Sequence, residues 1–482
     1  MFFQFNVSMN FNEMMRKHKK IIGLLLSIIV LSCTPRVSKE GMVSFEKDYV
    51  DVLIRNVNIF NGTDSMLIKN KHVYLKNGLI QSISDSVPIT SKEVYSIDGT
   101  DKTLMPGLID AHVHLSGSGS LPWDNYKGNE AYNLSAYLYS GITTIYDLGG
   151  ISTSLESFKK KIAQGKFPGP DIFHTHIPIT VKNSHPIPLT KELLYWPLNK
   201  MVNIIYTTIN KPEEAKNLVI KYKKLNVDYI KIIVDEIPPG SPQMPFDLIK
   251  ELVKESHLAG FKVFVHIGSP QNAIDAINAG ADVLAHGIWR GKLTYEQAQF
   301  IADSKVPMIY TLAAFNNVND IRKGTFVPSH FDSILVPMEI LKPLFFQSTN
   351  TFYSHKNINA FSAFFDDVAS KHSFLKYNFD LLTQKGVKIS IGTDSSLPGT
   401  YAGSNYYREM ELLQEYGLSP YQILKGATFG NSKLFLDKPD FGFVDVNYKA
   451  DLLLINGNPL ERLDLVKNPE LIISRGRLVK RK

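Results

Sequence analysis

The chain has 482 residues, 44% hydrophobic and 21% charged, which is an ordinary globular composition and enough to bury a large core. Its formal net charge is +7, of which +3 comes from the first 32 residues, through Arg16, Lys17, Lys19 and Lys20 against Glu13. The remaining +4 is spread along the chain without a basic cluster, which excludes nucleic-acid binding through a phosphate-contacting patch.

The N-terminus has the pattern of a targeting segment. A cationic run precedes the apolar stretch Ile21 to Leu31, which is too short to span a bilayer comfortably. The stretch ends in Val30-Leu31-Ser32-Cys33, which resembles the lipobox of bacterial lipoproteins, and Cys33 is the chain's one cysteine. We expect a signal peptide at 1–32 and a lipid anchor on Cys33, on the periplasmic or surface face of a bacterial envelope membrane. A plain signal peptide is the alternative, and the true start methionine stays open.

Both ends of the chain carry strand and hairpin signals. Short alternating runs near the N-terminus are punctuated by Asn-Gly pairs, and they lie at 52–60, 72–75, 80–83 and 94–97. Similar runs return at 450–455 and 471–479. We predict a composite β-sandwich domain from 48–105 and 441–482, preceded by a flexible tether at 33–47.

The middle of the chain, 106–440, alternates short apolar strands with amphipathic helices, which is typical of βα units around a parallel sheet. The clearest stretch runs through a strand, a helix, a strand, a helix and a strand, at 227–234, around 249–253, at 262–267, 273–279 and 283–286. This periodicity suits either a (β/α)8 barrel or a doubly wound sheet. Residues 315–376 break the rhythm, and in a barrel they would form a long loop or insert near the substrate pocket.

Two histidines, His112 and His114, close an apolar run with period-two spacing, so both imidazoles point to one strand face. Neutral imidazole is a suitable ligand for zinc and its neighbours. The pair alone is weak evidence, because His174 and His176 have the same spacing and such pairs also occur without a metal.

Other polar residues sit at or near the ends of apolar strand-like runs, namely His266, His286 and Asp394. In a barrel these ends meet at one mouth, so residues remote in sequence can surround one metal. Lys231 lies inside the apolar run Tyr229 to Val234, where burying an ammonium is costly and lowers its pKa. A strand-end lysine that extends to solvent is the alternative reading.

From about residue 50 to its end, the chain resembles the amidohydrolase superfamily, in the branch of imidazolonepropionase-like proteins and metal-dependent Xaa-Pro dipeptidases. The motifs stand in the family's order: Pro106-Gly-Leu-Ile-Asp-Ala-His-Val-His114, Gly141-Ile-Thr-Thr-Ile-Tyr-Asp-Leu-Gly149, Asp228-Tyr-Ile-Lys-Ile232, His266, His286-Gly287, Gly392-Thr-Asp394 and Ala450-Asp-Leu-Leu-Leu-Ile-Asn-Gly-Asn-Pro-Leu460.

This resemblance implies a (β/α)8 barrel, a β sandwich from the two ends, and two divalent metals, for which Zn²⁺ is the first choice. It implies that His112, His114 and Asp394 hold the more buried metal and that His266 and His286 hold the more exposed one. It also implies a carboxylated Lys231 as bridging ligand, a hydroxide shared by the metals as nucleophile, and Asp394 as the catalytic proton shuttle.

The implied reaction is hydrolysis of a C–N bond in a small amide or peptide, such as an Xaa-Pro dipeptide. Where relatives commonly carry Gly-Gly-His-Gly, this chain has Asn183-Ser-His185-Pro186, so His185 and Arg290 are only candidate substrate-binding residues. The alternatives are a cyclic amide hydrolase or deaminase of the same superfamily, or a binding lipoprotein without catalysis. Self-association into a homo-oligomer is left open.

Overall fold

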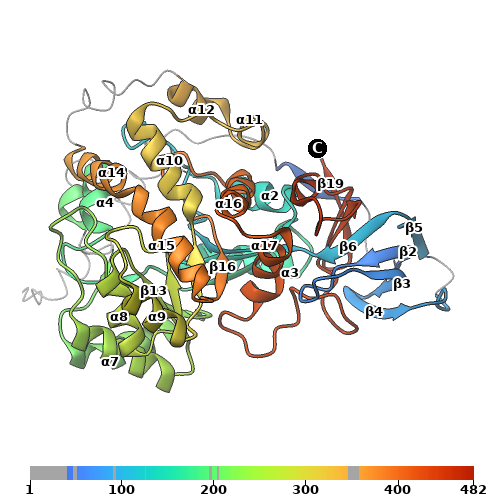
Figure 1. Ribbon diagram of the computed structural model, residues 1–482, viewed down its shortest axis with the longest axis horizontal. Helices are drawn as coiled ribbons and strands as arrows, with labels where there is room; N and C mark the ends of the chain where they lie inside the picture. Colours follow the sequence, from blue (N-terminus) through green and yellow to red (C-terminus); the bar gives the residue numbers. More distant parts are fainter. Residues whose placement is uncertain are drawn as a thin grey trace, which may run out of the picture.

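A computed structural model describes residues 41–46, 51–90, 94–124, 126, 128–194, 198–202, 206–345 and 358–482. The targeting segment and Cys33 lie outside these residues. Figure 1 shows two parts: a larger body of strands covered by helices, and a group of strands at one end that contains β2 to β5 and β19.

The smaller part is a mixed sheet built from both ends of the chain. Its strands are β1 Val43–Phe45, β2 Asp51–Ile59, β3 Ile68–Lys76, β4 Leu79–Ser84, β5 Val94–Asp98, β6 Lys102–Pro106, β17 Leu452–Asn456, β18 Leu471–Ser474 and β19 Arg477–Arg481. The order is β1-β19-β18-β17-β6-β2-β3-β4, with β5 paired to β2. The prediction that both chain ends contribute strands to one β structure is confirmed for the sheet, because β17 lies antiparallel to β6; the sandwich and its domain bounds stay predictions.

The local turns follow from residues that tolerate positive φ. Asn77 and Gly78, at φ 52° and 78°, join β3 to β4, as an Asn-Gly hairpin signal predicts. The run 471–479 is two strands, because Arg475 and Gly476 turn the chain between β18 and β19 at φ 52° and 74°. Strand β1 lies inside the expected tether, and its Val43 is buried.

The larger part contains two groups of parallel strands, and within each group the strands pair in chain order apart from the short β11. They are β7 Leu108–Val113, β8 Ile142–Asp147, β9 Asp171–His174, β10 Ile179–Thr180, β11 Thr207–Thr208, β12 Ile230–Ile233, β13 Val263–His266, β14 Val283–Ala285, β15 Met308–Tyr310 and β16 Ile389–Ile391. One group is β7-β8-β9 and the other β11-β10-β12-β13-β14-β15-β16. The amide of Asp228 donates to the His174 carbonyl, and the amide of Asp394 donates to the His112 carbonyl. The arrangement is consistent with a TIM barrel.

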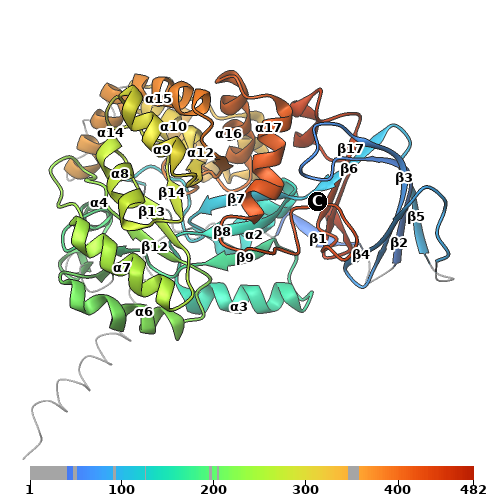
Figure 2. The same cartoon turned by 60° about the horizontal axis from the view of Figure 1, so that its bottom comes forward.

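Helices cover the outside of these strands (Figure 2). They are α2 Glu130–Tyr139, α3 Ser152–Ala163, α4 Ile187–Leu193, α6 Ala215–Lys223, α7 Phe246–Leu258, α8 Pro270–Ala279, α9 Tyr295–Asp303, α10 Leu312–Lys323, α11 His330–Leu335, α12 Met338–Phe345, α14 Asn359–Lys371, α15 Ser373–Gln384, α16 Ser404–Glu415 and α17 Pro420–Lys425. Shorter helical turns are η1 Leu198–Lys200, η2 Pro212–Glu214, η3 Gly426–Gly430 and η4 Leu463–Lys467.

Helix α7 illustrates why these segments fold as they do. Leu248, Ile249, Leu252 and Val253 are buried, and their three- and four-residue spacing places them on one face that packs toward the strands. The helix predicted around residues 249–253 is therefore confirmed. The next helix, α8, begins with a capping box in which the Ser269 hydroxyl accepts from the Asn272 amide.

The described part of residues 315–376 follows β15 and precedes β16, and it contributes most of α10 together with α11, α12 and α14. Figure 1 shows α14 beside α4 at the end of the body that lies away from the terminal strands. This placement brings α14 to the side where the polar strand ends lie.

Candidate metal centre

The strand ends bring His112, His114 and Asp394 together. His112 lies in β7, and Asp394 follows β16 by three residues. The same carboxylate oxygen, Oδ1 of Asp394, lies 3.2 Å from His112 Nε2 and 3.1 Å from His114 Nε2. The His112 and Asp394 side chains are buried and that of His114 is partly exposed, so this corner faces both the protein interior and open space.

The second histidine pair lies beside this corner. His286 follows β14, and its Nε2 is 3.0 Å from Nδ1 of His266 at the end of β13. The rings of His286 and His112 are 4.6 Å apart between centroids. Single ligand atoms of His112, His286 and Asp394 all lie within 4.8 Å of one another. Two imidazole nitrogens and a carboxylate that converge in this way suit a divalent cation.

Burial keeps most of these imidazoles neutral, which is the state that binds a metal. Desolvation, assisted by Lys231, holds the pKa of His112 well below its usual range, and desolvation does the same for His266 and His286. Burial also lowers the pKa of His114, but its hydrogen bond and charge contact with Asp394 outweigh that effect and raise it.

Asp394 remains a carboxylate. Burial alone would raise its pKa, but the neighbouring His286 and His114 offset this and leave the pKa below the ordinary value. The backbone of Asp394 has φ 53°, a left-handed conformation that is uncommon for a residue other than glycine.

Lys231 lies in the middle of β12 and is 1% exposed. Its Nζ has no hydrogen-bond partner among the described residues. Burial lowers the pKa of this amine to about 7, although Asp394 acts in the opposite direction. Near neutral pH a large share of the amine is therefore uncharged, which is the form that reacts with carbon dioxide.

A cavity of about 430 Å³ contains all of these side chains, a volume suited to a small-molecule site. The residues that the sequence singled out and that line it are His112, His114, His185, Lys231, His266, His286 and Asp394. The ring of His185 lies 5.1 Å from that of His266, and burial lowers its pKa to about 4. His185 is thus a neutral hydrogen-bonding group beside the candidate ligands.

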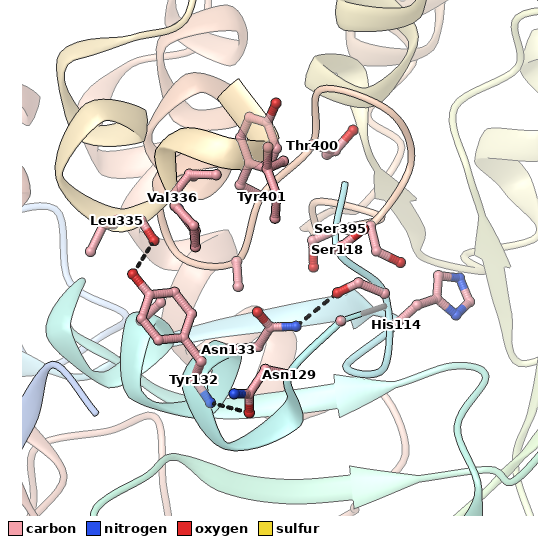
Figure 3. A pocket seen from close by; sticks show the side chains of 17 residues that line it. His114, Ser118, Asn129, Tyr132, Asn133, Leu335, Val336, Ser395, Thr400 and Tyr401 are labelled. Carbon is pink, nitrogen blue, oxygen red and sulfur yellow. Dashed lines mark hydrogen bonds between the residues drawn. The ribbon is translucent and has the colours of Figure 1, made fainter. Parts of the chain in front are cut away.

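A much smaller space of about 30 Å³ lies next to His114 and is lined by residues of α2 and of the segments 335–340 and 395–402. Figure 3 shows His114 at its edge, with Asn133 and Ser118 among the other residues that line it. Asn133 Nδ2 donates to the carbonyls of Leu115 and Gly117 and so fixes the loop after His114. A space of this size holds about one water molecule, so the larger cavity is the candidate substrate site.

Arg290 does not line the larger cavity. Its Nη1 donates to Asp235 Oδ1 at 2.6 Å, and its Nε donates to Asp367 Oδ2 at 2.8 Å. Its guanidinium also lies over the Trp289 ring, at 4.5 Å from the centroid. The structure therefore uses Arg290 to tie three segments together, and a role in binding a substrate carboxylate stays a prediction.

Asp235 is a site residue that sequence reasoning did not single out. It is fully buried four residues after Lys231, and its Oδ2 lies 3.5 Å from His266 Nε2. Since Nδ1 of His266 faces His286, the carboxylate lies behind the nitrogen that points away from the cluster. A carboxylate behind a metal-binding histidine orients the ring and raises its basicity.

The parallel strands bring their carboxyl ends to one side, where two histidines and an aspartate form a buried cluster. This combination is typical of a metal-dependent hydrolase. The profile of the Amidohydrolase family matches residues 103–321 and 352–479. The chain belongs to this family, and it is an amidohydrolase-family hydrolase with a buried metal site formed by His112, His286 and Asp394.

Known proteins of similar sequence or fold extend this result. A 5-methylthioadenosine/S-adenosylhomocysteine deaminase from Caldanaerobacter subterraneus subsp. tengcongensis is 21% identical over 441 residues, 85% of each chain. A crystal structure of a Xaa-Pro dipeptidase with bound methionine has a TM-score of 0.70 at 21% identity, covering 90% of this chain and all of that one. A prolidase complexed with N-methylphosphonate-L-proline has a TM-score of 0.67 at 20% identity, with the same coverage. These structures show the shared fold.

We expect Asp235→Asn to weaken metal binding by about 10- to 100-fold, because the amide no longer supplies the charge that orients His266. Zn²⁺ affinity, measured by competition with a chelator, tests this without any assay of activity. The matched control is Glu236→Gln, since Glu236 is the next acid along the chain and its carboxylate lies 3.7 Å from Arg290. Equal Zn²⁺ affinity in Asp235→Asn and wild type would contradict the assignment.

Proposed function

We propose that this protein hydrolyses a C–N bond of a small amide or peptide, with dipeptides such as Xaa-Pro as the first substrates to test. The observation that carries the proposal is the single cavity in which neutral imidazoles, an ionised Asp394 and the buried Lys231 amine meet. The dipeptidase and prolidase whose folds resemble this one support the choice of dipeptides. We further propose that the parallel strands close into a (β/α)8 barrel and that the sheet built from the two chain ends is part of a β sandwich.

The residues fit a pair of divalent cations, and Zn²⁺ suits their nitrogen and oxygen donors. His112, His114 and Asp394 would hold one cation, and His266 and His286 the other. Lys231 would lie between them as a carbamate, because its neutral amine can add to carbon dioxide with loss of a proton. Bound cations would make a water more acidic and polarise the scissile carbonyl.

Asp394 then moves the proton. Its Oδ1 faces His112 and His114, while its Oδ2 lies 3.8 Å from His286 Nδ1, so the carboxylate sits between the two histidine groups. As an anion it can accept a proton from the attacking water and deliver it to the leaving nitrogen, which must be protonated to depart. His185, which lines the same cavity as His266, would hydrogen-bond the substrate.

The same site could also serve a cyclic amide hydrolase or a deaminase, and the similar deaminase supports including such substrates. A panel of dipeptides, acyl amino acids, lactams and aminopurine nucleosides separates these reactions by product. The family assignment and the assembled ligand cluster favour an enzyme over a binding protein without catalysis.

We also propose that the mature protein begins at Cys33 and carries a lipid anchor there. The support is the sequence pattern at 30–33. In the described part of the chain, none of the helices combines the length and the apolar character needed to cross a bilayer.

Replacement of Lys231 by Ala should lower metal content well below two ions per chain, because the bridging anion is lost. Short carboxylic acids should restore part of that content by supplying an anion in the same place. Elemental analysis of purified protein provides the measurement. Two tightly held ions in Lys231→Ala would rule out the bridge.

The variant Asp394→Asn keeps the size and one coordinating oxygen but cannot carry a proton. We expect turnover of the best substrate to fall by at least about 10²–10⁴-fold, with a much smaller change in KM. Steady-state kinetics on protein matched for metal content makes the comparison. A variant as fast as wild type would remove Asp394 from the proton transfer.

Substitution of Cys33 by Ser should release the protein from membranes, because serine cannot receive the thioether-linked lipid. Fractionation of cells that express each form, followed by detergent extraction, gives the readout. Wild-type protein found entirely in the aqueous fraction would refute the anchor.

A further inference from the structure

The cavity has an aromatic wall that begins at the metal centre. Phe315 of α10 lies edge-on to His286, with ring centroids 5.7 Å apart. Phe361 and Phe364 of α14 line the same cavity, as do Leu189 and Leu193 of α4. Trp289 links the rings from behind, at 5.3 Å from Phe315 and 6.3 Å from Phe364. A substrate at the metal centre would therefore contact an extended apolar surface.

This wall is held in place by charged side chains. The Glu192 carboxylate of α4 accepts from the amides of Ala360 at 2.7 Å and Phe361 at 3.1 Å, which caps the N-terminal end of α14 with a negative charge. Farther along α14, Asp367 accepts from Arg290. Both contacts join α14 to other segments and so anchor the helix that carries Phe361 and Phe364.

Charge within the cavity is confined to the metal centre. Among the described residues that line it, Lys231 is the one lysine or arginine and Asp394 the one acid. Arg290, which lies behind the wall, is engaged by Asp235 and Asp367. A charged substituent placed against the phenylalanines would lose its hydration without gaining a partner, whereas an apolar one gains about 25 cal/mol per Å² buried.

We propose that Phe315, Phe361 and Phe364 form a subsite for a neutral aromatic or bulky aliphatic group on one side of the scissile amide. The subsite rests on the proposed function and names its substrate class: amides and peptides that carry such a group, in preference to those with a small or charged one. The helices between β15 and β16 select among substrates by their side chains. The metal centre performs the same hydrolysis on each amide that binds.

The test uses matched substrates that differ in one substituent. Two dipeptide series carry Phe, Leu, Ala, Glu or Lys, one on the acyl side and one on the amine side of the same amide. We expect kcat/KM in one series to be roughly 10- to 100-fold higher for Phe or Leu than for Ala, and lower still for Glu and Lys. Equal rates across both series would overturn the subsite while leaving the proposed hydrolysis intact.

Variants of α14 test whether the aromatic wall sets this substrate preference. Phe361→Ala should reduce the Phe-to-Ala preference by at least about 5-fold, while Phe361→Lys should raise the rate with Glu relative to Phe. The control is Phe365→Ala, because Phe365 is a buried phenylalanine of the same helix that does not line the cavity. An equal loss of preference in Phe365→Ala would mean that α14 packing, and not the Phe361 ring, sets selectivity, and would overturn the subsite.

Binding separates this subsite from the proposed reaction. Calorimetry with metal-loaded Asp394→Asn compares two pairs of amides: N-benzoyl against N-acetyl amides of one amine, and N-acetyl amides of benzylamine against those of methylamine. Tighter binding of the aromatic member of one pair by the wild-type wall, lost in the Phe361→Ala background, supports the subsite even if no amide is hydrolysed. Equal affinity within both pairs overturns it even if hydrolysis is found.

Discussion

The site depends on one backbone contact between strands that are far apart in sequence. The amide of Asp394 donates to the His112 carbonyl at 2.8 Å, joining the end of β16 to β7. A side chain at Gly392 would bring its Cβ to 2.6 Å from the His112 Cβ, so only glycine permits this approach. The Asp110 carboxylate adds two bonds, from the Thr393 amide and hydroxyl. These contacts place the Asp394 carboxylate against two imidazoles.

Placing Asp394 in this way costs backbone strain and requires the burial of ionisable groups. Asp394 adopts a left-handed backbone conformation worth of order 1–3 kcal/mol of strain, and burial raises the pKa of Asp110 to about 7. Lys231 is enclosed, and its Nζ has no hydrogen-bond partner in the part of the chain that the structure describes. The buried Asp394 carboxylate and its neighbouring imidazoles suit a divalent cation, because a cation replaces part of the hydration that these groups lose on burial.

The sequence was sufficient to predict which histidines and which aspartate lie at the ends of the parallel strands. His112, His266, His286 and Asp394 each follow or close a short apolar run, and parallel strands must bring those ends to one side. It was not sufficient to predict the ion pairs of Arg290 with Asp235 and Asp367, because they join three segments that are distant in sequence, one of them α14. The Glu192 carboxylate of α4 also joins α14 through its first amides, and no local pattern encodes this contact. The hairpin at 475–476 was missed because Arg475 is an unusual residue for a left-handed turn.

The sheet shared by the two chain ends also governs the order in which the molecule can be completed. Strand β6 pairs with β17, whose residues are synthesised only after the entire helical body, and β1 pairs with β19 at the far end of the sequence. Until those last strands exist, one edge of β6 presents unpaired backbone groups, the kind of surface on which chains aggregate. Contacts of such long range slow folding. The sheet that joins the two parts of the sequence therefore stays incomplete until β19 has been synthesised.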